Sequence, residues 1–411
     1  MPTRKILIST WGSLGDLFPY LALAGELARR GHHVAICTTP YHQQRIEEAG
    51  FQFYSSAPHL NFESTELRRA IMEDRRSGQL LLRDILLAQV RQSYADLLEA
   101  TCGAELLITQ MVAYAGPILA AKTGIPWIST MLAPTGFFSY HDSPVLAPEL
   151  RGLRERAPAI HAMVNRAARW TTRHWGDPVR QLRVELGLDR GGDPVFEGQH
   201  SPTRVLALFS RELAEPQPDW PRNTVVTGFL FNDEPPLPPA VEQFLRAGDP
   251  PIVFTLGSSA VHAPGRFYEE SLEAARRLGR RAILLGGPAV CDTGILGIEY
   301  APHGRLFREA AAIIHQGGIG TTGRAMSAGR PMLVVPWAYD QPDNAARLVR
   351  KGMALTIGRR SYNAGRAMHA LEELLTNPSY RRNAEATAAR LNAENGLQVA
   401  ADSVTQTLAT L

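Results

Sequence analysis

The chain has 411 residues, of which 45% are hydrophobic and 20% are charged, and its formal net charge at pH 7 is +3. This composition is typical of a globular protein, the length predicts two or three domains, and the small net charge argues against a nucleic-acid partner. No apolar run reaches the roughly 18 residues that a membrane-spanning helix needs. We therefore expect no transmembrane segment, while peripheral membrane contact stays open.

The cysteines and the N-terminus indicate the compartment. Cys37, Cys102 and Cys291 are isolated and odd in number, so they predict neither a disulfide framework nor a CxxC metal site. The N-terminus enters a strand directly at Lys5–Thr10, without an apolar signal region. Together these features predict a cytoplasmic protein.

The first half of the chain alternates expected strands with expected helices. A strand at Ile6–Ser9 leads into a glycine-containing turn and a helix over about 19–30, which Gly31 ends. Further strands are expected at 33–38, 50–54, 106–109 and 126–131, and further helices at 41–49 and 80–100. Such alternation predicts βαβ units and a parallel sheet with helices on both faces.

A proline-rich stretch separates this half from a second one. Seven prolines bracket the strand expected at Val225–Thr227, and this density predicts a surface linker within 215–240. The alternation then restarts, with strands expected at 252–255, 282–285, 312–314 and 331–335. We predict an α/β protein of two Rossmann-like domains facing each other across a cleft. The predicted segments are a first domain at 1–220, a linker region at 221–240, a second domain at 241–385, and a C-terminal helix at 386–411 that packs back toward the first domain.

The stretch Ile313–Asn344 is the most informative in the chain. A strand expected at 312–314 is followed by His315 and then by a run of glycines and hydroxyls; a second strand leads to the acid–amide pair Asp340–Gln341. The members of that run are Gly317, Gly318, Gly320, Thr321, Thr322 and Gly323. Glycines let backbone N–H groups approach a phosphate, and a helix N-terminus adds partial positive charge. In a parallel sheet Asp340 and Gln341 would emerge at the same carboxyl edge, where they could bind sugar hydroxyls or merely form the turn before Pro342. A diphosphate beside a hydroxyl-rich group describes a nucleotide sugar.

Other residues of the second half are candidates for the same ligand, each with an ordinary structural alternative. A lone histidine is usually structural, but the glycine turn and both threonines converge on His315 and favour phosphate contact. Ser258, in the turn TLGSS, is either a second diphosphate contact or a plain turn serine. Tyr300 and His303, in EYAPHG, form either an ordinary loop or an aromatic platform for a base.

The first turn, TWGSLGD at Thr10–Asp16, does not bind a dinucleotide. It lacks GxGxxG, and no acid closes the following strand to hold a ribose hydroxyl, so a nicotinamide enzyme is excluded. Asp16 stands at the helix start, where it either caps free N–H groups or accepts a proton from an acceptor hydroxyl. Gly15 beside it joins the candidate donor-binding residues.

Three aromatic residues are candidates for the acceptor site, and the sequence has no motif for a metal site. Phe137, Phe138 and Tyr140 follow a strand and are either core residues or the wall of a pocket for an apolar, ring-bearing acceptor. No HExxH, Walker loop, GxSxG elbow or DxD-type metal pair is present, so we expect no metal, and helix dipoles with His315 would stabilise the leaving group. The arginines at 68, 69, 75 and 76 are expected to be a solvent-exposed helix face.

At this point the motifs resemble a known family. HQGGIGTT at 315–322 and PMLVVPWAYDQPDNA at 331–345 resemble the donor-binding motif of family 1 GT-B glycosyltransferases. The similarity is greatest to the bacterial branch with antibiotic glycosyltransferases, sterol glucosyltransferases and rhamnolipid rhamnosyltransferases. The opening GSLGDLFPYLALAGELARRGHHV resembles the N-terminal motif of that branch, and TLGSS and YAPH follow in the expected order. The resemblance implies an acceptor-binding first domain, a donor-binding second domain, inverting transfer from a UDP- or dTDP-sugar as co-substrate, and no metal or other cofactor.

The resemblance also assigns roles by position. It places His315 and the 317–322 turn on the diphosphate with Ser258 beside it, Tyr300 and His303 near base and ribose, Asp340 and Gln341 on the sugar, and Asn344 in support of that loop. Plant relatives use a histidine base relayed to an aspartate. Here the first turn carries Asp16, and LLITQM offers Thr109 and Gln110 instead of an acid, so Asp16 would act by itself.

The sequence thus predicts a glycosyltransferase. It would move glucose or a deoxysugar such as rhamnose to a hydroxyl of a small lipophilic acceptor: a natural product, a flavonoid-like phenolic, a sterol or a lipid. One alternative is a nucleotide-sugar 2-epimerase, which would need carboxylates around the sugar, whereas the motifs supply only Asp16 and Asp340. The other is a non-catalytic nucleotide-binding partner of a true transferase. The expected assembly is a monomer or a homodimer.

Overall fold

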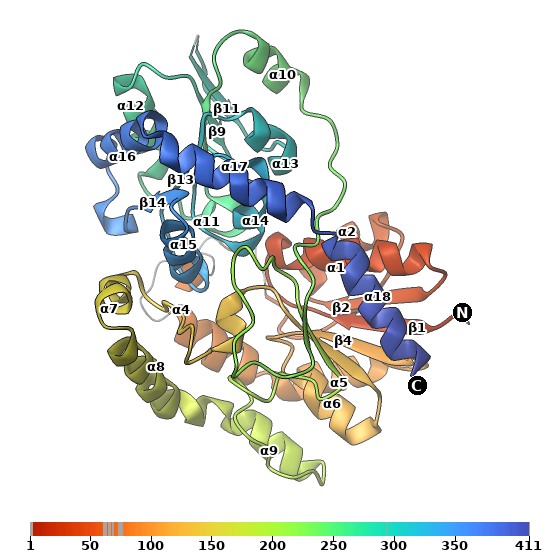
Figure 1. Ribbon diagram of the computed structural model, residues 1–411. Helices are drawn as coiled ribbons and strands as arrows, with labels where there is room; N and C mark the ends of the chain where they lie inside the picture. The colour runs from red at the N-terminus through yellow and green to blue at the C-terminus, as the bar shows by residue number, and fades with distance from the viewer. Residues whose placement is uncertain are drawn as a thin grey trace. The chain divides into compact units, whose positions relative to one another are not determined.

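The computed structural model describes residues 3–60, 64, 67, 70–72, 77–292 and 294–410. Figure 1 shows the chain, which divides into two compact units. The N-terminal unit comprises Met1–Pro144, Leu153–Asn232 and Asn395–Leu411, and the C-terminal unit comprises Val145–Gly152 and Asp233–Glu394. The arginines at 68, 69, 75 and 76 lie outside the described residues.

The N-terminal unit is built on a seven-stranded sheet in which all pairs are parallel. Its order is β3-β2-β1-β4-β5-β6-β7. The strands are β1 (Lys5–Ser9), β2 (His33–Thr38), β3 (Gln52–Ser55), β4 (Leu106–Gln110), β5 (Trp127–Met131), β6 (Arg204–Ala207) and β7 (Thr224–Val226). The strand order reverses between β1 and β4, and the carboxyl ends of two such strands are where open α/β sheets bind ligands.

Helices connect these strands, as the alternation predicted. They are α1 (Leu14–Arg29), η1 (Pro40–His42), α2 (Gln43–Glu48), α4 (Ser77–Gln79), the π-helix η2 (Leu80–Leu87), α5 (Val90–Ala100), α6 (Ala115–Thr123), η3 (Pro134–Phe137), α8 (Pro158–Thr172), η5 (Arg173–Gly176), α9 (Asp177–Glu185) and α18 (Gly396–Ala409). The chain re-enters the unit with α18, which packs on α1, where Arg30 pairs with Asp402 at 2.7 Å.

The start of the first helix differs from the prediction. The sequence placed it near Pro19, but α1 begins at Leu14 and contains Pro19 in its second turn. The reason is the cap: the backbone N–H of Ser13 donates to the Asp16 carboxylate at 2.8 Å, which fixes the helix start five residues earlier. Asp16 therefore lies inside the first helical turn.

The C-terminal unit has a second seven-stranded sheet, in the order β10-β11-β9-β8-β12-β13-β14. All pairs are parallel except β10–β11, a short antiparallel hairpin absent from the prediction. The strands are β8 (Ile252–Thr255), β9 (Ala282–Leu285), β10 (Cys291–Asp292), β11 (Ile295–Ile298), β12 (Ala312–His315), β13 (Met332–Val334) and β14 (Ala354–Thr356). The order reverses between β8 and β12, so two units of the expected Rossmann-like type are confirmed.

The helices of this unit cover its sheet. They are η4 (Pro148–Leu150), α10 (Pro239–Arg246), α11 (Gly257–Ala260), α12 (Phe267–Arg277), α13 (His303–Leu306), η6 (Phe307–Glu309), α14 (Ile319–Ala328), α15 (Gln341–Arg350), η7 (Arg359–Ser361), α16 (Ala364–Thr376) and α17 (Pro378–Asn392), while α7 (Arg151–Arg156) spans a unit boundary. The chain passes between units at 144–145, 152–153, 232–233 and 394–395. Within the described residues, no helix combines the length and apolarity that crossing a membrane requires.

Candidate functional site

His315 ends strand β12 with its side chain completely buried. Its Nδ1 accepts a hydrogen bond of 3.1 Å from the backbone N–H of Gly317. Because a backbone N–H can only donate, the proton of this imidazole sits on Nε2. Burial, together with the neighbouring His303, lowers the pKa of His315 to about 3. The side chain is therefore a neutral hydrogen-bond donor at physiological pH and not a positive charge.

The glycine turn after His315 is shaped by close approach. Gly317 has a φ of +91°, and a Cβ there would lie 2.9 Å from a methyl group of Val334. Only glycine fits both the backbone angle and the space. Gly318 is the N-cap of α14, so the N–H groups of the first turn of that helix are left without intrahelical partners. Thr321 and Thr322 lie buried in the same first turn.

Four buried polar side-chain atoms around this turn have no hydrogen-bond partner among the described residues. They are His315 Nε2, Gln316 Oε1, Thr322 Oγ1 and Asn344 Oδ1. Buried polar groups are almost always paired, and a single exception needs an explanation. All four belong to one unit, where His315 ends β12, Gln316 follows it, and Thr322 and Asn344 lie in α14 and α15, so a polar ligand at this turn would pair them.

The acid–amide pair stands at the start of α15, where Asp340 is the N-cap and Gln341 the first helical residue. Gln341 is buried, and its Oε1 accepts hydrogen bonds from the N–H groups of Trp337 at 2.8 Å and Ala338 at 3.1 Å. Asp340 accepts from Asn344 Nδ2 at 2.7 Å, and the same Nδ2 donates to Gly317 O at 2.9 Å. Asn344 thus joins the start of α15 to the glycine turn, and Gln341 uses its amide oxygen to hold the loop before it.

The β8 turn lies against the same place. Gly257, with a φ of +62°, would have its Cβ 2.3 Å from Gln316 Nε2, so the turn that carries Ser258 contacts the His315 turn directly. His303 begins α13 and stacks on Phe307 at 4.8 Å. Burial and the charge of Arg324 lower the pKa of His303 to about 4. Tyr300, just before α13, is 58% exposed.

A second polar cluster occupies the N-terminal unit. Asp16 Oδ2 accepts from Ser13 N at 2.8 Å and from Ser13 Oγ at 2.9 Å, while Oδ1 accepts from Gln110 Nε2 at 3.1 Å. Burial raises the pKa of Asp16, and the hydrogen bonds from Ser13 and Gln110 oppose that rise. Helix capping and proton acceptance are compatible roles for Asp16. Oδ2 caps the helix start, and Oδ1 keeps a lone pair that could accept a proton.

The turn before Asp16 leaves no room for a side chain. Gly12 has a φ of +139°, and a Cβ there would lie 2.4 Å from Asp16 Oδ2. His42, on η1, donates from Nε2 to the carbonyl oxygen of Gly12 at 2.9 Å and is itself buried. Gly15 lies within the first turn of α1. Sequence reasoning missed His42, since its contact depends on how η1 folds over the turn.

The three aromatic candidates do not share one environment. Phe137 is buried in the N-terminal unit and stacks on Trp220 with ring centroids 3.9 Å apart. Phe138, at a φ of +45°, packs edge-on against Phe196 at 4.6 Å. Tyr140 is exposed, and its hydroxyl accepts from Arg169 at 2.7 Å.

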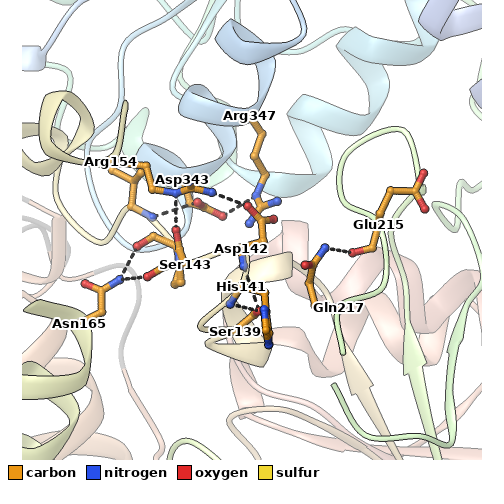
Figure 2. Close-up of polar contacts among 12 residues, drawn as sticks. Ser139, His141, Asp142, Ser143, Arg154, Asn165, Glu215, Gln217, Asp343 and Arg347 are labelled. Carbon is orange, nitrogen blue, oxygen red and sulfur yellow. Dashed lines mark hydrogen bonds and ion pairs between the residues drawn. The ribbon is translucent and has the colours of Figure 1, made fainter. Parts of the chain in front are cut away.

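The segment after Tyr140 is held by polar contacts (Figure 2). Arg154 pairs with Asp142 at 2.5 Å and donates to Ser143 O at 2.8 Å, and Asn165 donates to Ser143 Oγ at 2.8 Å. Within the C-terminal unit Figure 2 also shows the ion pair Asp343–Arg347, at 2.7 Å. This second pair lies in α15, directly after the acid–amide loop.

In the part of the chain that the structure describes, no three histidine, cysteine, aspartate or glutamate side chains are grouped as metal ligands would be.

Two α/β units, one with a glycine turn lined by unpaired polar groups and one with a partly buried carboxylate at its switch point, define a GT-B glycosyltransferase. Comparison with known proteins leads to the same class. Residues 6–129 match the Glycosyltransferase family 28 N-terminal domain, and residues 289–411 match the Erythromycin biosynthesis protein CIII-like, C-terminal domain.

Similar proteins extend along nearly the whole chain. O-mycaminosyltylonolide 6-deoxyallosyltransferase of Streptomyces fradiae is 31% identical over 420 residues, which cover 95% of both chains. Glycosyltransferase GtfE of Amycolatopsis orientalis is 31% identical over 373 residues, which cover 85% of both. The solved structure of glycosyltransferase VinC in complex with DTDP has the same fold, with a TM-score of 0.68 at 21% identity over 98% of this chain and 99% of VinC. The chain belongs to the GT-B glycosyltransferase family, in the group of antibiotic and sterol glycosyltransferases, and is an enzyme.

Proposed function

We propose that this enzyme is an inverting transferase that moves a hexose or deoxyhexose from a UDP- or dTDP-sugar to a hydroxyl of a small lipophilic acceptor. The observation that carries the proposal is the set of four unpaired buried polar atoms around the 316–322 turn. The Streptomyces fradiae relative is a deoxyallosyltransferase, and VinC was solved in complex with DTDP. Both support a nucleotide sugar as the donor.

The C-terminal unit would hold the donor. His315 Nε2 donates to a diphosphate oxygen, and the free N–H groups at the start of α14 bind the same anion. Asp340 and the amide nitrogen of Gln341 take the sugar hydroxyls, and the Ser258 turn adds a further contact to the diphosphate. Tyr300 and His303 flank the base and ribose.

The N-terminal unit would supply the base. Asp16 Oδ1 accepts the proton of the acceptor hydroxyl while its oxygen forms a bond to the anomeric carbon. The bond from that carbon to the diphosphate oxygen breaks on the opposite face, and the nucleoside diphosphate leaves with the electron pair. The configuration at the anomeric carbon is inverted, and the proposed donor contacts stabilise the departing charge.

Asp16→Asn tests this assignment. The amide keeps the shape of the side chain but cannot take a proton, so turnover with an aliphatic alcohol should fall by about 10²–10⁴-fold while donor affinity is kept. A phenol that is already ionised needs no base, so the loss should shrink with phenolic acceptors above their pKa. Product formation is followed by mass spectrometry. Wild-type turnover of Asp16→Asn with an alcohol would refute the assigned base.

The same assay separates the alternatives. An epimerase would convert the nucleotide sugar without any acceptor, and a non-catalytic partner would bind it without forming product. A thermal-shift screen of UDP- and dTDP-sugars identifies the donor, because a ligand of the folded state raises the melting temperature. We place the reaction in the cytoplasm, since Cys37, Cys102 and Cys291 are all free, the last two of them exposed.

A further inference from the structure

Gln110 is the last residue of β4 and is only 4% exposed. Strand β4 pairs with β1 in parallel register, with Thr109 opposite Ser9. Thr10, the first residue beyond β1, and Gln110, the last residue of β4, therefore lie side by side at the carboxyl edge of the sheet. The side chain of Gln110 lies between Thr10 and Asp16 as a consequence.

Chemistry alone determines which way the amide of Gln110 points. Its Oε1 accepts from Thr10 Oγ1 at 2.8 Å and from the backbone N–H of Trp11 at 2.7 Å. An amide nitrogen cannot accept the Trp11 N–H, so oxygen must face Trp11 and the NH₂ group must face Asp16. The 3.1 Å contact from Nε2 to Asp16 Oδ1 is thus a donated hydrogen bond.

The two oxygens of Asp16 are held differently. Oδ2 receives both hydrogen bonds from Ser13, one residue of its own turn. Oδ1, the oxygen with a lone pair left for the acceptor proton, receives its hydrogen bond from another strand. A hydrogen bond donated to a carboxylate favours its ionised form, which is the form that can act as a base. A second carboxylate at the same place would disfavour that form.

We propose that Gln110 is a positioning residue for the transfer reaction, which holds Asp16 Oδ1 ionised and in place by donating one hydrogen bond to it. This inference rests on the proposed function, in which Asp16 is the base. Thr10 and Trp11 are the anchors that keep the amide in the donating orientation.

Two other titratable groups near Asp16 have pKa values shifted in favour of their neutral forms. Tyr20, one helical turn further along α1, has its pKa raised by burial, and its hydroxyl is hydrogen-bonded to Thr130 at 2.5 Å. His42, which faces the turn from η1, has its pKa lowered, above all by burial. The acid limb of the pH–rate profile should therefore report Asp16.

The test is the pH–rate profile of three variants, with transfer to an aliphatic alcohol and donor hydrolysis by water as probe reactions. Neither acceptor ionises over the range used. Gln110→Met removes the donor at similar volume and should move the acid limb up by about one pH unit and lower kcat near neutral pH about 10-fold, with the donor KM unchanged. Thr10→Val loosens the anchor and should give a smaller shift.

Gln110→Glu makes the test specific. It keeps the shape and the contacts to Thr10 and Trp11 but places a second acid against Asp16, so the acid limb should move further up than in Gln110→Met. A merely structural residue would show the opposite order, with the isosteric glutamate closer to wild type. Gln92→Met, the same change at an exposed site of the same unit, is the matched control and should match wild type.

The outcomes separate the two hypotheses. An inactive Asp16→Asn together with an unshifted acid limb in Gln110→Met and Gln110→Glu would overturn the role of Gln110 alone. Wild-type turnover of Asp16→Asn would overturn the assignment of the base itself. Circular dichroism melting of each variant checks that the fold is intact. If Gln110→Met is unfolded, the isosteric Gln110→Glu variant alone still tests the role of Gln110.

Discussion

Removing the imidazole in His315→Ala should weaken donor binding without any dependence on pH. The structure assigns His315 one free donor, Nε2, on a neutral ring whose pKa burial lowers to about 3. A hydrogen bond to a charged group contributes about 1.5–3 kcal/mol, so the dissociation constant for a nucleotide sugar should rise about 10- to 150-fold. His369→Ala, at an exposed histidine of the same unit, is the control and should bind as wild type does.

Isothermal titration calorimetry with UDP- and dTDP-glucose measures the effect. Nucleotide sugars suit this assay, because their diphosphate has no terminal group that titrates near neutral pH. Between about pH 5 and 8 the wild-type affinity should stay level, since the imidazole is uncharged throughout. An affinity that rises as the pH falls through the ordinary histidine pKa would show a cationic His315 and refute the tautomer argument. Unchanged affinity in His315→Ala would remove the residue from the donor site.

Three further variants test features of the two units. Gly12→Ala places a Cβ 2.4 Å from Asp16 Oδ2 and should abolish most turnover while donor binding in calorimetry stays normal; an active variant would show that the turn can yield. At pH values above the raised pKa of the Asp16 carboxyl, Asp16→Asn should also increase the free energy of unfolding. This gain should shrink as the pH falls through that pKa and below 3.8, because the carboxyl group then carries a proton in both states; a constant difference would contradict this. Asp343→Ala removes the carboxylate that pairs with the buried Arg347 guanidinium at 2.7 Å and should cost about 3–5 kcal/mol in urea unfolding, whereas a loss below about 1 kcal/mol would show that this ion pair contributes little to stability.

Much of the fold follows from local sequence patterns. Strands β8 and β9 lie at the predicted residues 252–255 and 282–285, since short apolar runs bounded by glycine or proline have few alternatives. The hairpin β10–β11 was missed, because a two-residue strand such as Cys291–Asp292 carries no periodicity. The start of α1 was missed, because Pro19 imitates a helix start although Ser13 and Asp16 form the real one.

Some features of the candidate site could also be predicted from the sequence, and others could not. The glycine turn was predictable, since the spacing of glycines and hydroxyls after a strand is itself the signal. The neutral state of His315 was not predictable, because it depends on the direction of the Gly317 N–H. The role of Gln110 was also out of reach: its partners lie about 100 residues away in sequence and meet it only through the register of β1 and β4.

The unpaired atoms around the glycine turn have a consequence for evolution and engineering. Each buried polar group without a partner costs about 1–3 kcal/mol, so these groups lower the stability of the fold. Replacing Thr322 by valine should make the protein more heat-resistant and a poorer transferase at once. Stability and donor binding therefore oppose each other in this turn.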